Sequence, residues 1–114
     1  LSRNLTLAAS GGADAKITAI ETENLTVVVS GGADAEIEGV CNILTAAVSG
    51  GADLMAGALE AKSVEVVASG GADAVVLATE SLNIAASGGA DVVYIGEPEH
   101  TDIKTSGGAS VSHR

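Results

Sequence analysis

The five residues SGGAD at positions 10–14 recur at 30–34, 49–53, 69–73 and 87–91, and a variant, SGGAS, occupies 106–110. The first Ser of each copy stands at 10, 30, 49, 69, 87 and 106, so successive copies lie 18 to 20 residues apart. A fixed period of this length is typical of repeat proteins in which each unit packs only against its neighbours. The motif therefore predicts a repeat architecture.

The residues on either side of the motif alternate between inward apolar and outward positions. Before the second copy, Thr26 separates Leu25 from Val27, and after it residues 35–38 are AEIE. Alternation with a period of two is typical of β-strands. The pair of glycines in every unit disfavours helix. Each unit is therefore predicted to hold two short strands joined by the motif.

A unit of this size cannot fold alone and has no room for a crossover helix. Stacking the units lets each strand pair in parallel with its equivalent one unit on, about 4.8 Å away. The sequence thus predicts an all-β fold, a β-solenoid of about six coils, as one domain over residues 1–114. Coils of 18–20 residues begin near residues 5, 25, 44, 64, 82 and 101. The Ala of each motif is expected to fill the core at a tight corner.

Composition excludes several classes of function. Fifteen acidic and five basic residues give a net charge of −10, which disfavours nucleic acids and anionic lipid as partners. No apolar run is long enough to span a membrane, and no signal peptide is visible. Cys41 is the only cysteine and is expected to be a buried thiol rather than part of a disulfide or metal site. No phosphate-binding or zinc motif is present, so no cofactor is expected.

Stacking places one Asp of each full motif in a single row, and two interpretations of that row remain open. In the first, the glycines turn the chain and the Ser and Asp side chains cap amides of the turn. In the second, the row binds a cation such as Ca²⁺, or a glycan. One carboxylate per coil is few for Ca²⁺, which takes six to eight oxygen ligands. The candidate metal ladder is Asp14, Asp34, Asp53, Asp73 and Asp91.

Several outward positions of the predicted strands are apolar, which is unusual for a solvated surface. They predict an interaction surface, covered by a second copy or by another partner. The candidate residues are Val28, Val67, Val75, Leu77, Val93 and Ile95.

The C-terminal third carries an ordered ending in addition to the repeat. Residues 91–98 read DVVYIGEP, and the last copy of the motif continues as SGGASV at residues 106–111. With the upstream repeats, this ending resembles the bacterial head GIN domain family, described as putative auto-transporter adhesins. The resemblance implies a right-handed parallel β-helix on an exported or surface-associated protein, and it does not imply any catalytic residue. Family members carry further β-structure before the repeats, so it also implies that this chain is a fragment or that its first coil pairs with another copy.

The sequence therefore predicts a non-catalytic, adhesin-like solenoid in the extracellular space, on the cell surface or in the periplasm of a bacterium. It would act through self-association, using an apolar face or the bare first coil, or by binding a surface glycan or protein. The alternative is a cation- or glycan-binding module built on the Asp row. A third interpretation, a minimal β-helix carbohydrate enzyme, lacks support, because such sites need clustered carboxylates with Lys or Arg in a groove and this chain has five basic residues. A Ser-His-Asp arrangement could be assembled on paper from Ser106, His100 and Asp102, but nothing marks it as a catalytic triad.

Overall fold

The structure is a computed structural model that describes the backbone of residues 2–113 and the side chains of residues 4–18 and 21–113. Strands make up 74% of the chain, and the described residues contain no helix, so none that could span a membrane. The elements are β1 (Ser2–Ala9), β2 (Asp14–Val29), β3 (Asp34–Val48), β4 (Asp53–Ala68), β5 (Asp73–Ala86), β6 (Asp91–Ile95), β7 (His100–Thr105) and β8 (Ser110–His113).

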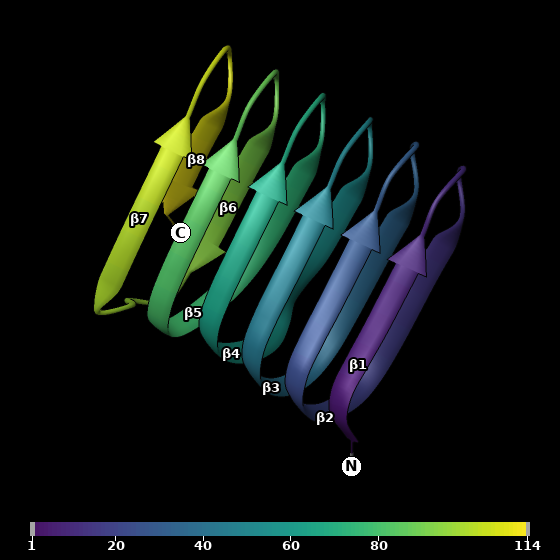
Figure 1. Ribbon diagram of the computed structural model, residues 1–114, viewed down its shortest axis with the longest axis vertical. Helices are drawn as coiled ribbons and strands as arrows, with labels where there is room; N and C mark the ends of the chain where they lie inside the picture. The colour runs from purple at the N-terminus through teal and green to yellow at the C-terminus, as the bar shows by residue number, and fades with distance from the viewer. Residues whose placement is uncertain (1, 114) are drawn as a thin grey trace.

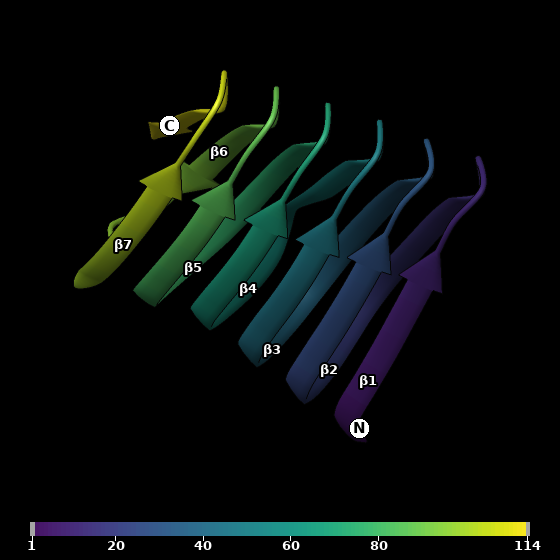
Figure 2. The ribbon, with the colours of Figure 1, turned by 45° about the horizontal axis from the view of Figure 1, so that its top comes forward.

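The strands form a flattened solenoid of about six coils with two walls (Figure 1). We call the wall that leads into each SGG corner the front wall; it contains β1, β7 and the second halves of β2 to β5. The back wall begins at the residue after each corner Ala and contains β6, β8 and the first halves of β2 to β5. In Figure 1 the front wall runs upward, the back wall returns downward, and each coil lies to the left of the last, so the winding is right-handed. The tilted view of Figure 2 shows the two walls as distinct layers. The predicted β-solenoid is confirmed.

The pairing is parallel throughout and follows the predicted repeat. Leu5 pairs with Leu25, and the same row continues through the later coils to Leu82 and Thr101. The last coil differs because residues 96–99 interrupt the long strand: Gly96 has a φ of 99°, and Pro98 has no N–H to donate to a ladder. The back half of β5 therefore pairs with β6 and its front half with β7.

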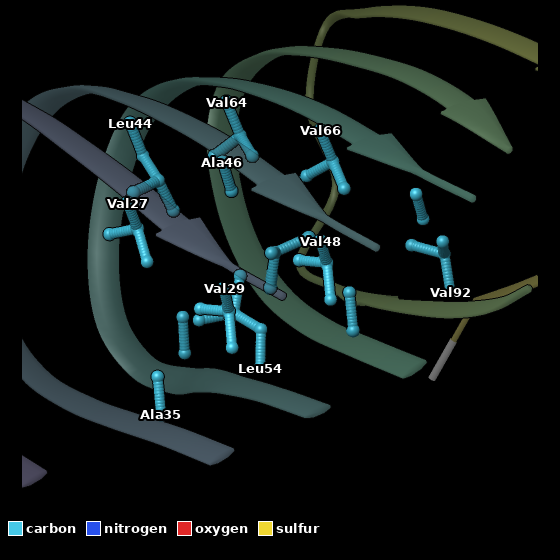
Figure 3. Packing of buried hydrophobic residues seen from close by; sticks show 14 of the residues in the cluster. Val27, Val29, Ala35, Leu44, Ala46, Val48, Leu54, Val64, Val66 and Val92 are labelled. Carbon is cyan, nitrogen blue, oxygen red and sulfur yellow. The ribbon is translucent and has the colours of Figure 1, made fainter. Parts of the chain in front are cut away.

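Apolar side chains of both walls meet in one core between them (Figure 3). The corner alanines of the inner coils are fully buried, as predicted: Ala33, Ala52, Ala72 and Ala90. Ala13 in the first coil is exposed, because no earlier coil covers it in the structure.

A further buried row at the bend opposite the corner was not predicted. It pairs Thr22, Cys41, Ala61 and Ala78 in successive coils, and Leu59 lies beside it without exposure. Cys41 is buried as predicted, and burial raises the pKa of its thiol to about 11. Together with the inward residues of the corner and the two walls, this row fills the interior of each coil, mostly with small and medium aliphatic side chains.

From the second corner on, backbone hydrogen bonds hold the corner residues, which corrects the predicted capping role of Ser and Asp. The Ala33 N–H donates to the Ser30 carbonyl oxygen at 3.3 Å, and the Asp34 N–H donates to Ala13 of the coil before at 2.9 Å. In the described part of the chain, no motif Ser or Asp side chain donates to or accepts from a turn group. The described motif Asp side chains therefore point outward and form no hydrogen bond that holds the turn.

Candidate interaction face

The five motif aspartates form one row on the outer surface of the back wall, as the repeat predicts. Each pairs in register with the next, and Ser110 takes the same position in the last coil. Equivalent residues of neighbouring parallel strands lie about 4.8 Å apart. The pKa of Asp53 is raised, first by partial burial and then by the carboxylates of Asp34 and Asp73 on either side. The row is thus a strip of mutually repelling negative charge.

Positive charge near this row is scarce. Lys16 Nζ lies 4.0 Å from Glu36 Oε1, and both side chains are largely exposed, so this pair contributes little to stability. Among the described residues, no three His, Cys, Asp or Glu side chains are arranged to hold a metal ion. The Asp row is therefore a source of negative potential without an evident coordination cage.

Beside the row, the outer surface of the back wall becomes apolar in the middle and later coils. Met55, Val75 and Val93 pair in register, and each lies two residues after a motif Asp. Met55 is 54% exposed. Leu77 and Ile95 pair further along the same strands. Four of the six predicted surface residues therefore lie together: Val75, Leu77, Val93 and Ile95.

The other two predicted surface residues lie on the opposite wall. Val28 and Val67 are exposed on the front wall, with Ala47 between them in register. The sequence prediction thus combined two separate faces. Exposed Val40 and Ile43, near the bend, were missed, because the strand alternation changes there and no simple pattern marks them.

Two hollows make the back wall concave. One, of about 380 Å³, is lined by acidic residues of the first three coils together with Lys16 and Met55. The other, of about 330 Å³, is lined mainly by apolar residues of the middle coils. Both are lined by Glu36 and Met55, so they are neighbours on this wall, and we call the two together the back-wall groove.

Gly57 creates the apolar end of this groove. A Cβ at this position would meet Val75 Cγ1 at 3.2 Å and Ile95 Cδ1 at 3.3 Å. The two aliphatic side chains therefore lean over the glycine from the following coils. A larger residue at position 57 would press against both side chains and displace them.

The last described coil is closed by an aromatic contact. The rings of Tyr94 and His113 stack with centroids 4.6 Å apart, and His113 Nε2 contacts the Gly96 carbonyl oxygen. Tyr94 is partly buried against the core.

Solved structures of two bacterial proteins are among those that share this fold. A putative adhesin from Bacteroides fragilis NCTC 9343 is 26% identical and aligns over 99% of this chain and 52% of its own, with a TM-score of 0.94. A putative lipid binding protein from Parabacteroides distasonis ATCC 8503 is 18% identical and aligns over 99% of this chain and 56% of its own, with a TM-score of 0.79. The chain spans about half the length of these two proteins. Among curated proteins, none matches it. The sequence profile described as "Putative auto-transporter adhesin, head GIN domain" matches residues 1–98.

Proposed function

Because the chain belongs to the head GIN domain family of putative auto-transporter adhesins, we propose that it is a non-catalytic binding module at the bacterial cell surface or envelope. The family description and the name of the Bacteroides fragilis relative support an adhesin-like role. The binding surface that we propose is the back wall of the middle and later coils.

The observation that carries this proposal is the apolar end of the back-wall groove. Val75 and Ile95 border a hollow of about 330 Å³ over Gly57, and Met55 beside it is more than half exposed. Apolar surface that stays in water costs free energy, roughly 25 cal/mol for each Å² that a partner would cover. A contiguous apolar face with a concave centre is typical of interaction sites.

Charge favours a different protein over a second copy as the partner. Two copies facing each other through this wall would bring their Asp rows, Glu36 and Glu38 into one interface. Like charges a few ångströms apart repel by about 1 kcal/mol per pair even in water, and more where water is excluded. With a net charge of −10, self-association through this face is opposed, whereas binding of an uncharged or basic partner is not.

The test is attachment of chain-coated fluorescent beads to intact Bacteroides fragilis cells. The double variant Val75→Thr/Ile95→Thr keeps β-branched side chains but makes the groove polar; Val28→Thr/Val67→Thr makes the same change on the front wall as a matched control. We expect wild-type and control beads to attach and the groove variant to lose most of its attachment, while all three show similar thermal unfolding. Equal attachment of the two variants, or attachment of wild-type beads no better than that of albumin-coated beads, would refute the proposal.

A further inference from the structure

The Asp row and the apolar row of the back wall run side by side along the solenoid axis. Asp53, Asp73 and Asp91 form one row, and Met55, Val75 and Val93 form the other. Within each strand, the members of the two rows are two residues apart, about 7 Å along an extended chain. Three successive coils therefore repeat one unit, a carboxylate next to an aliphatic side chain.

The repeat distance of these rows matches a helix better than an extended peptide. Coils recur about every 4.8 Å, and an α-helix rises 5.4 Å per turn. Across the three coils the two spacings diverge by only about 1 Å, which flexible Lys or Arg side chains absorb. An extended peptide repeats its side chains on one face about every 6.8 Å. Its side chains are therefore out of register with the coils after one interval.

The lateral spacing fits a helix as well. A helix with its side chains is about 10–12 Å across, so rows about 7 Å apart contact neighbouring stripes of a single helix. One stripe would carry a basic residue on each turn, facing the aspartates. The adjacent stripe would carry apolar residues that cover the aliphatic row and the hollow over Gly57.

We propose that the back wall of these coils binds a basic amphipathic helix of a partner protein, with its cationic stripe on Asp53, Asp73 and Asp91 and its apolar stripe on Met55, Val75 and Val93. This inference rests on the proposed binding role of the back wall and specifies the chemistry of the partner. A cationic stripe offsets the repulsion within the Asp row, which no Lys or Arg among the described residues of these coils does. The apolar stripe removes from water the exposed Met55 side chain and the half-buried side chains of Val75 and Val93.

The probe is a synthetic helical peptide of about 18 residues, with Lys at i, i+4, i+7 and i+11 and Leu along the neighbouring stripe. A second peptide has the same composition, with the Lys residues distributed around the helix. Fluorescence anisotropy measures binding of each peptide to the whole chain. We expect the first peptide to bind, to bind more weakly as salt rises, and to bind more tightly than the second.

Variants of the chain locate the site. Exposed ion pairs contribute about 0.2–1 kcal/mol each, so Asp73→Asn/Asp91→Asn is expected to weaken binding roughly 2- to 30-fold. Val75→Thr/Val93→Thr is expected to weaken it too, with less effect on its salt dependence. The matched front-wall control, Glu65→Gln/Val67→Thr, removes one charge and one aliphatic side chain and is expected to leave binding unchanged.

Three results would overturn the inference: no binding of the first peptide, equal binding of both peptides, or an equal loss in the front-wall control. If beads still attach to cells through the back wall while the peptide fails, the assigned partner chemistry is wrong and the binding role stands. If the peptide binds as expected while the beads do not attach to cells, the inferred chemistry is supported and the cell-surface role fails.

Discussion

Replacing the first glycine of an inner corner by alanine is expected to destabilise the solenoid strongly. Gly50 has a φ of 68°, and a Cβ on it would lie 3.0 Å from the Gly31 nitrogen and 3.3 Å from the Gly31 Cα in the preceding coil. The left-handed conformation costs a non-glycine residue roughly 1–2 kcal/mol. Because the close atoms are backbone, relief requires the two corners to move apart, at a cost comparable to overpacking a core, roughly 1–3 kcal/mol.

Two neighbouring glycines separate the conformational cost from the steric one. Gly32 has a φ of 86° but nothing within 4 Å of its would-be Cβ, whereas Gly51 has neither a left-handed φ nor a close atom. Alanine also reduces the entropy of the unfolded chain, which stabilises the fold by about 0.4–1 kcal/mol where the backbone permits it. The net destabilisation is then about 2–4 kcal/mol for Gly50→Ala and about 1 kcal/mol or less for Gly32→Ala, and Gly51→Ala is neutral or slightly stabilising.

Urea denaturation, followed by circular dichroism, tests this order of stabilities. A lower midpoint urea concentration means a lower free energy of unfolding, provided that the slope of the transition is the same for all variants. All three positions lie in the second and third corners, so fraying of the end coils affects them alike. If Gly50→Ala and Gly51→Ala unfold at the same urea concentration, stacked corner backbones do not limit the spacing of the coils, and the account of the motif given above is wrong.

Four further predictions concern charge, the core and metal. Asp53→Asn is expected to raise the urea midpoint at pH 7 but not at pH 3. Folding raises the pKa of Asp53, so the folded state favours the protonated carboxyl and loses stability as the pH rises through that pKa. An unchanged midpoint at pH 7 would contradict this. Cys41, with a pKa of about 11, should react with a disulfide reagent at pH 8 only after unfolding, and rapid labelling of the folded chain would contradict its burial. Ala72→Val overpacks a fully buried corner and should cost roughly 1–3 kcal/mol by urea denaturation, whereas Ala13→Val, at an exposed corner, should cost little. Calcium and EDTA should leave the melting temperature unchanged, because each coil offers one motif carboxylate and Ca²⁺ takes six to eight oxygens; a rise with calcium would favour the cation-binding alternative.

The corner could be predicted from the sequence because its length is the same in every coil. Counting outward from SGGAD assigns the correct inward residues on both walls, including Leu25 before the corner and Ala35 after it. The bend could not be predicted in the same way, since all the variation in repeat length falls there. The pairing register shifts between Ile17 and Ile20, and again between Glu36 and Glu38. A shift of one residue exchanges the inward and outward faces of a strand, so the buried row containing Cys41 and Ala61 was missed.

The candidate site shows a different limit of sequence pattern. Alternation identifies Val67 and Val75 as outward aliphatics on the two different strands of a coil, but only the path of the chain places those strands on opposite walls (Figure 1). The close packing of Val75 and Ile95 over Gly57 depends on the absence of a Cβ there, and no pattern in the sequence marks that position. The Asp row, in contrast, follows directly from the repeat. Because its carboxylates repel one another, the row lowers the stability of the fold. The register that stacks the corners also holds the carboxylates of Asp34, Asp53 and Asp73 against one another, although no turn amide needs them. The basic helix that we propose as a partner would offset this repulsion, and the variants of Asp73 and Asp91 test it.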